Sequence, residues 1–274
     1  MSTPAIALTE APKSNPVKPS VRRLDWSMLI GIAIVLVAVI AGIMSTGVRL
    51  NYFFQPTGAL IVLGGTFGVT FVTTPRRALV HSLRRVFGLT RTINVRREVL
   101  IEEILRYVKA ARSSGLLSIE SSIDQASDPF LKECLMLTID VRERSELQAV
   151  LDIKIRLRER QGEADAKALE VAGGFAPTIG VIGTVVGLID VLRQFSDLNA
   201  VAYGIGTAFV STVYGLALAN FVLLPAGHRI RAHVAERFEI HELIAEGSLC
   251  LFDRIHPALV RERLNAFLRE SKSE

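Results

Sequence analysis

The 274-residue sequence has few of the residues that build several common kinds of scaffold and site. Two cysteines are too few for a disulfide-stapled fold. No glycine-rich loop ends in Lys-Ser or Lys-Thr, so a nucleotide site of the P-loop kind is excluded. No cysteine–histidine cluster has metal-ligand spacing, and neither a nucleophile elbow nor a zincin motif is present. We therefore expect no catalytic residue, no metal site and no cofactor.

Charge is also missing, from four long stretches of the chain. Charged residues make up 22% of the sequence, yet the mean hydropathy is +0.37 and half of the residues are hydrophobic, so the apolar and charged residues must be segregated. The charge-free runs are 26–48, 50–75, 171–189 and 198–227. Each is long enough to cross about 30 Å of hydrocarbon as a helix. The sequence therefore predicts an all-α membrane protein with four transmembrane helices.

The distribution of basic residues predicts the orientation of these helices. Lys and Arg flank the runs on one side only, at 18–23, 76–85 and 228–237. The other side carries few charges, namely Arg49 between the first two runs and Asp190, Arg193 and Asp197 between the last two. The positive-inside rule then places both termini and the central loop in the cytoplasm. The net charge of +5 reflects this topology rather than binding to nucleic acid.

Outside the charge-free runs, the sequence predicts helices and one disordered N-terminal tail. Residues 1–24 are proline-rich at their start and predict a disordered tail. The loop 76–170 contains an amphipathic stretch at 96–112, and the tail 228–274 continues the last span as a helix. The stretch at 96–112 carries apolar residues on one face: Leu100, Ile101, Ile104, Leu105 and Val108. No segment alternates like a strand. Cys134 and Cys250 would lie in the reducing cytoplasm as thiols.

An acidic residue is missing from the middle of every span. Pathways for protons or sodium ions usually contain a carboxylate within the membrane, because a dehydrated cation needs a fixed negative partner. The nearest acid here is Asp190, at the outer end of the third run. If the chain conducts ions, another chain is expected to supply the carboxylate.

The domain from 171 to 227 contains the most specific residue pattern, and its members fall into three groups. The first group is a stripe of small residues that permits close helix packing, namely Gly180, Gly183 and Gly187. The second consists of two prolines that remove backbone donors near the cytoplasmic ends of the spans, namely Pro177 and Pro225. The third consists of two hydroxyl side chains at membrane depth, namely Thr184 and Thr212. From the residues alone, each threonine could simply bond back to its own helix.

The stretch P-x-x-G-x-x-G-T-x-x-G-L, a short turn and a span that ends in Y-G-x-x-x-A-N-x-x-x-x-P together resemble the MotA/TolQ/ExbB ion-channel family. The resemblance is strongest to the MotA/PomA branch of flagellar stator A subunits. That branch shares the four-span count, the GGT motif at 64–66 and the segment RSSGLLSIE at 112–120. The resemblance covers about residues 25–260, whereas the proline-rich lead is longer than is usual in the family.

This resemblance implies roles for the residues that match. Pro177 and Pro225 match two prolines associated with conformational change during ion passage. Thr184 and Thr212 match positions that line the ion path. In the loop, Arg112 and Glu120 match residues that engage the rotor protein FliG, although the charges around them differ from those of well-known members.

The resemblance also implies an assembly and a mechanism. The family forms a homopentamer around two MotB-type subunits, each with one span that carries an aspartate, which fits the missing carboxylate. Ion flow, of H+ or Na+, would turn the ring within the lipid bilayer of a bacterial inner membrane, and the loops would pass torque to the rotor. A transmembrane potential of 100 mV supplies about 2.3 kcal/mol per charge, enough to bias such a step. A non-flagellar MotA-like or TolQ/ExbB-like energiser stays open as an alternative.

Overall fold

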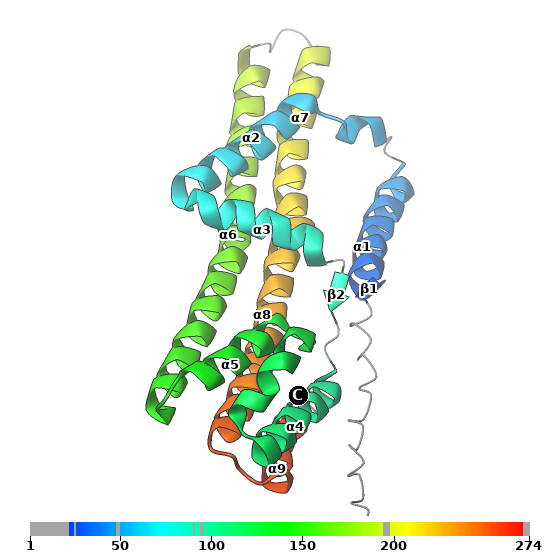
Figure 1. The fold of residues 1–274 in the computed structure, drawn as a ribbon. Coiled ribbons are helices and arrows are strands. Elements are labelled where there is room, and N and C mark those ends of the chain that lie inside the picture. The colour runs from blue at the N-terminus through cyan, green and yellow to red at the C-terminus, as the bar shows by residue number, and fades with distance from the viewer. Residues whose placement is uncertain are drawn as a thin grey trace, which may run out of the picture. The chain divides into compact units, whose positions relative to one another are not determined.

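The computed structural model describes residues 22–24, 26–47, 50–89, 91–93, 96–193 and 198–270, and almost all of them are helical (Figure 1). The chain divides into two compact units. The described residues of 22–94 and 148–243 form the first, which contains the apolar helices. The described residues of 95–147 and 244–274 form the second.

The first unit consists of long helices and a short ribbon. Its elements in chain order are β1 (Arg22–Leu24), α1 (Trp26–Ser45), the 3₁₀ turn η1 (Leu50–Phe53), α2 (Pro56–Thr73), α3 (Arg76–Leu89), β2 (Arg91–Ile93), most of α6 (Arg144–Arg193), α7 (Leu198–Ala217), the π-helical η3 (Leu218–Leu223) and most of α8 (Leu224–Phe252). The second unit adds α4 (Arg97–Ser114), the 3₁₀ helix η2 (Leu116–Gln125), α5 (Pro129–Asp140) and α9 (Pro257–Glu270).

Among the residues that the structure describes, three helical segments are long and apolar enough to cross a membrane. They are α2, a stretch within α6, and a stretch within the helix that runs from Leu198 through η3 into α8. The first charge-free run forms α1. Within α1, residues 33–45 form an apolar helical stretch that is shorter than the three spans. The chain is therefore a helical membrane protein with three clear spans.

The second unit has a compact core, because the apolar face predicted for 96–112 is buried. Leu100, Ile101 and Val108 of α4 are each at most 2% exposed. The prediction of an amphipathic helix is confirmed, although α4 runs on to Ser114. At the next helix, Asp128 caps α5 by accepting hydrogen bonds from the backbone N–H groups of Phe130 (2.7 Å) and Leu131 (3.3 Å).

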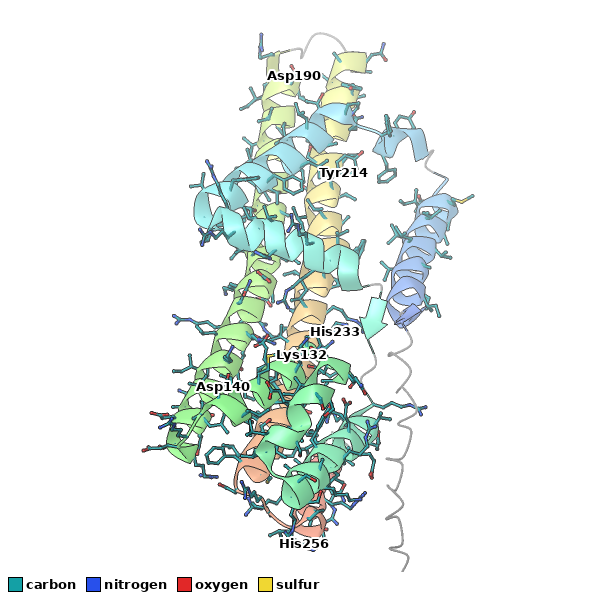
Figure 2. All side chains as sticks on the ribbon, in the orientation of Figure 1. Lys132, Asp140, Asp190, Tyr214, His233 and His256 are labelled. Carbon is teal, nitrogen blue, oxygen red and sulfur yellow. The ribbon has the colours of Figure 1, made fainter. Side chains whose placement is uncertain are left out.

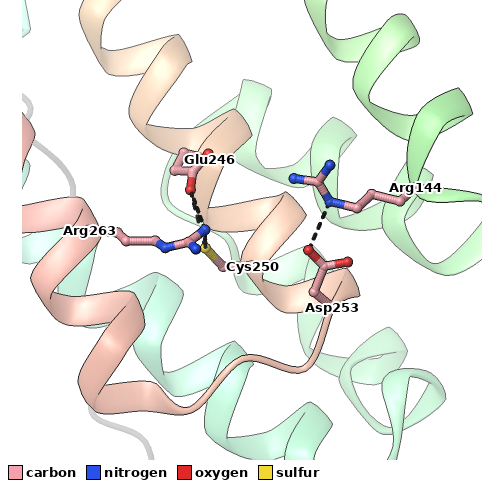
Figure 3. A network of polar contacts seen from close by, with 5 residues as sticks. All are labelled: Arg144, Glu246, Cys250, Asp253 and Arg263. Carbon is pink, nitrogen blue, oxygen red and sulfur yellow. Dashed lines mark hydrogen bonds and ion pairs between the residues drawn. The ribbon is translucent and has the colours of Figure 1, made fainter.

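Ion pairs join the helices that meet in this unit (Figure 3). Arg144, at the start of α6, pairs with Asp253 just after α8, with 2.8 Å between Nε and Oδ2. Arg263 of α9 reaches Glu246 of α8 at 3.2 Å and also approaches the sulfur of Cys250. Burial and the neighbouring Glu246 raise the pKa of the Cys250 thiol to about 11, so the neutral thiol is favoured at neutral pH even beside Arg263.

One sequence prediction is wrong in detail, and a second is extended by the structure. Residues 22–24, predicted to be part of a disordered tail in a protein without strands, form β1, which pairs antiparallel with β2 and places Arg23 opposite Thr92. Three-residue strands are too short to show an alternating pattern in sequence. The tail after 228 continues the last span as helix α8, as predicted, and a second helix, α9, follows it. Helix α8 ends at Phe252 and α9 begins at Pro257. In the turn between them, Arg254 takes a left-handed φ of 49°.

Candidate functional site

The two threonines expected in the ion path face each other between α6 and α7. The Oγ1 atoms of Thr184 and Thr212 lie within hydrogen-bond distance. Thr184 Oγ1 also lies 3.0 Å from the carbonyl oxygen of Ala208 on α7, and 3.2 Å from that of Gly180 one turn earlier in its own helix. The Thr184 hydroxyl has only one proton, so its bonds to the two carbonyls are alternatives that a rotation of the hydroxyl exchanges, whereas either hydroxyl can be the donor in the contact with Thr212. The threonines thus form a polar contact between helices, in addition to the local bond that Thr184 can make within its own helix.

This contact is possible because the glycine stripe of α6 faces α7. A Cβ on Gly187 would lie 2.9 Å from the backbone nitrogen of Ala208, and one on Gly180 would lie 3.0 Å from the carbonyl oxygen of Ser211. At Gly183 the nearest atom is the Ser211 side chain, at 2.8 Å. The two backbones therefore approach as closely as small residues permit.

Helix α2 packs against the same pair. A Cβ on Gly58 would lie 2.6 Å from Ser211 Oγ, and one on Gly65 would lie 2.6 Å from the side chain of Ile179. The Tyr214 hydroxyl donates to the carbonyl of Phe53 and accepts from the backbone N–H of Gln55 at 3.1 Å (Figure 2). Tyr214 therefore fixes the turn that precedes α2 onto α7. This role cannot be predicted from the sequence, because nothing in the sequence links residues 53 and 214.

The two prolines lie close to one crossing of α6 and α8. Pro177 stands inside α6, and Pro225 lies in the first turn of α8. A Cβ on Gly173, one turn before Pro177, would lie 2.7 Å from the side chain of Leu224, the neighbour of Pro225. Both prolines are thus within about one helical turn of the same contact.

A π-helical segment precedes Pro225. The N–H of Leu224 donates to the carbonyl of Ala219, five residues earlier, and the π pattern spans 218–223. Pro225 has no N–H for the carbonyl of Phe221, and a wider turn accommodates that loss. Such segments are frequent at functional sites and at kinks in helices. Only Pro225 itself signalled this irregularity in the sequence.

The two rotor-contact candidates lie on the surface of the second unit. Arg112 is in the last turn of α4 and Glu120 is in η2, and both are exposed. The Tyr107 hydroxyl donates to the carbonyl of Ser122 at 3.2 Å and so attaches η2 to α4. Burial raises the pKa of Tyr107 to about 12, so this donor keeps its proton at any physiological pH.

A buried carboxylate fixes the C-terminal end of η2, the helix that carries Glu120. Glu103 of α4, 2% exposed, accepts from the backbone N–H of Ser127 at 2.9 Å and from its hydroxyl. It thereby holds the turn between η2 and α5 onto α4. On the opposite side, Arg261 of α9 holds Glu102, and the pKa of the Glu102 carboxyl is lowered by its hydrogen bond to Arg261.

Comparison with known families and structures gives consistent matches along the chain. Residues 122–242 match the MotA/TolQ/ExbB proton channel family, and residues 29–112 match the N-terminal region of motility protein A. These two matches contain most of the residues described above.

Individual relatives extend the likeness to about nine-tenths of the chain. Motility protein A of Bacillus subtilis is 27% identical, over 89% of this chain and 91% of the relative. The chemotaxis protein PomA of Vibrio alginolyticus is 26% identical, over 91% and 97%. The flagellar MotAB stator complex from Bacillus subtilis contains a chain of the same fold, with a TM-score of 0.80, 26% identity, and coverage of 91% of this chain and all of that one.

Proposed function

The chain belongs to the MotA/TolQ/ExbB proton channel family, and we propose that it is the A-type subunit of a flagellar stator. In this role it conducts H+ or Na+ together with a MotB-type subunit that supplies the intramembrane aspartate. The observation that carries the proposal is the close-packed α6/α7 pair, which holds the hydroxyls of Thr184 and Thr212 together where the chain has no acid of its own. The likeness to proteins of flagellar motility supports the biological role.

The proposal includes a topology in the inner membrane. Four spans, α1 among them, would place both termini in the cytoplasm. This topology divides the chain into five segments. They are the N-terminal tail 1–24, the first pair of spans 26–75, the rotor-facing loop 76–170, the channel pair of spans 171–227 and the C-terminal helices 228–274. Five copies would surround two partner subunits, as in the stator family.

The threonine pair would serve the ion path by changing its hydrogen-bond partners. An ion that neutralises the partner's aspartate alters which contacts that carboxyl favours. A hydroxyl with three available acceptors can follow such a change without any backbone movement. Swimming speed measured against sodium concentration at fixed pH would identify the coupling ion.

The prolines would allow the cytoplasmic ends of the spans to move. A helix with a missing donor and a neighbouring π segment bends at lower energetic cost than a regular helix. Pro177 and Pro225 bracket the contact between Gly173 and Leu224, so bending there would move α6 and α8 together. Arg112 and Glu120 would then transmit the motion by changing their salt-bridge partners on FliG.

Complementation of a deletion strain tests the proposal. The wild-type chain should restore swimming, whereas Arg112→Glu should not. Arg106→Glu is the matched control, because Arg106 is also exposed on α4 but lies on another face of the helix, and it should restore swimming. Swimming that persists in a strain without any stator gene of this kind would refute the flagellar role. Loss of envelope integrity, with motility intact, would favour the TolQ/ExbB-like alternative.

A further inference from the structure

Helix α3 combines a basic sequence with an exposed apolar face, and neither feature has a role in the proposed ion path. We propose that α3 lies flat in the cytoplasmic membrane interface and binds the headgroups of anionic phospholipids. Arg76, Arg77 and Arg84 would contact the phosphates, while Val80 and Leu83 enter the acyl boundary. The inference rests on the chain being a membrane protein and does not depend on the flagellar role.

The connections of α3 place both of its ends at the membrane boundary. Its first residue, Arg76, follows the end of the α2 span at Thr73 by three positions. Its last residue, Leu89, leads into β2, which pairs with β1, and β1 ends at Leu24, two residues before the first apolar helix. A 14-residue helix is about 21 Å long. A helix joined at each end to the start or end of a span must lie along the surface rather than point away from it.

The packing of α3 gives an independent measure of its level. Val86 packs on a cluster from α6 and α8 that contains Leu169 and Ile230. Arg85 pairs with the buried carboxylate of Asp165 on α6, with 2.7 Å between Nε and Oδ2. These partners lie within about one or two turns of residues 171 and 227, where the charge-free runs meet the charged cytoplasmic segments. Helix α3 is therefore at the height of the lipid headgroups.

The outer face of α3 suits that environment. Val80 is 50% exposed and Leu83 is 49% exposed, which is unfavourable in water but favourable at an acyl boundary. Arg76, Arg77 and Arg84 are exposed on the same side, and among the described residues no carboxylate pairs with them. The helix itself has no acidic residue. Basic residues with apolar neighbours at this depth are complementary to anionic headgroups.

Lipid preference of the full-length protein tests the headgroup contacts. A variant with Arg76→Gln, Arg77→Gln and Arg84→Gln is compared with a control that carries Arg106→Gln, Arg142→Gln and Arg160→Gln, three exposed arginines outside α3. Native mass spectrometry across a titration measures binding of phosphatidylglycerol against phosphatidylcholine. A basic residue near an anionic surface contributes about fivefold, so the α3 variant should lose about 100-fold in preference. The control should keep the preference of the wild type.

Tryptophan fluorescence tests the depth of the apolar face. In a Trp26→Phe background, which removes the only native tryptophan, Leu83→Trp should be quenched by lipids with brominated acyl chains. Leu157→Trp, at an exposed position of α6 about 21 Å before the membrane run, should not be quenched. Equal quenching at the two positions, or equal lipid preference of the two arginine variants, would overturn the proposal. A change in oligomeric mass with unchanged lipid preference would show instead that the face contacts another copy of the chain.

Discussion

The close approach of α6 and α7 predicts the effect of adding a single methyl group. In Gly187→Ala, the new Cβ would lie 2.9 Å from the backbone nitrogen of Ala208, and 3.0 Å from both its Cα and its Cβ. No rotation of a side chain removes two backbone atoms, so the helices must separate by several tenths of an ångström. That separation also lengthens the contact between Thr184 and the carbonyl of Ala208, one turn away.

The change in stability of Gly187→Ala follows from two opposing effects. Overpacking of a tight contact costs about 1–3 kcal/mol, whereas replacing glycine by alanine within a helix gains about 1 kcal/mol. We therefore expect Gly187→Ala to be destabilised by about 1 kcal/mol, and the melting temperature to fall by about 2–4 °C. Gly183→Ala should be destabilised to a similar degree, because its new Cβ would lie 2.8 Å from the Cβ of Ser211, an atom that no side-chain rotation moves.

Gly174→Ala provides the matched control. Gly174 lies on the same helix, and a Cβ there would meet nothing within 4 Å, so only the gain in helix propensity remains. Thermal unfolding of the purified protein in detergent, followed by far-ultraviolet circular dichroism, should rank Gly174→Ala above the wild type and Gly187→Ala below it. Equal melting temperatures for the two variants would refute the close-packing argument, and so would a more stable Gly187→Ala. Swimming should be lost in Gly187→Ala, where the α6/α7 contact opens, and kept in Gly174→Ala, where it does not.

Two further predictions concern the second unit. Glu103→Ala leaves the backbone N–H of Ser127 without its buried acceptor and should destabilise the protein by about 1–3 kcal/mol in the same unfolding assay, whereas the exposed Glu98→Ala should change it little. The pKa of Glu102 is lowered from 4.5 in the folded state, so its pair with Arg261 stabilises the protein above that pH and is lost as the pH falls below it. The stability difference between wild type and Glu102→Gln should therefore shrink on acidification, and a difference that grows would contradict the pairing.

Much of the architecture could be predicted from sequence, because membranes enforce a simple rule. A charge-free run long enough to cross the bilayer must become a helix, which satisfies its own backbone groups. The apolar period of 96–112 is equally direct, since its five apolar residues are buried in the structure. Short elements lie beyond such rules. The β1–β2 ribbon depends on pairing between residues about 70 positions apart, and its strands are too short to show a period.

The geometry of the threonine site could not be predicted from the identities of its residues. A threonine in a membrane helix can bond to its own backbone, and nothing in sequence distinguishes that state from a contact across helices. Thr184 does both, because Gly180, Gly183 and Gly187 bring α7 near enough for the carbonyl of Ala208 to compete with that of Gly180. The same residue is therefore structural or switchable according to the distance between two backbones. The glycines set that distance, so the helix-packing stripe and the hydroxyl pair form one structural unit rather than two separate motifs.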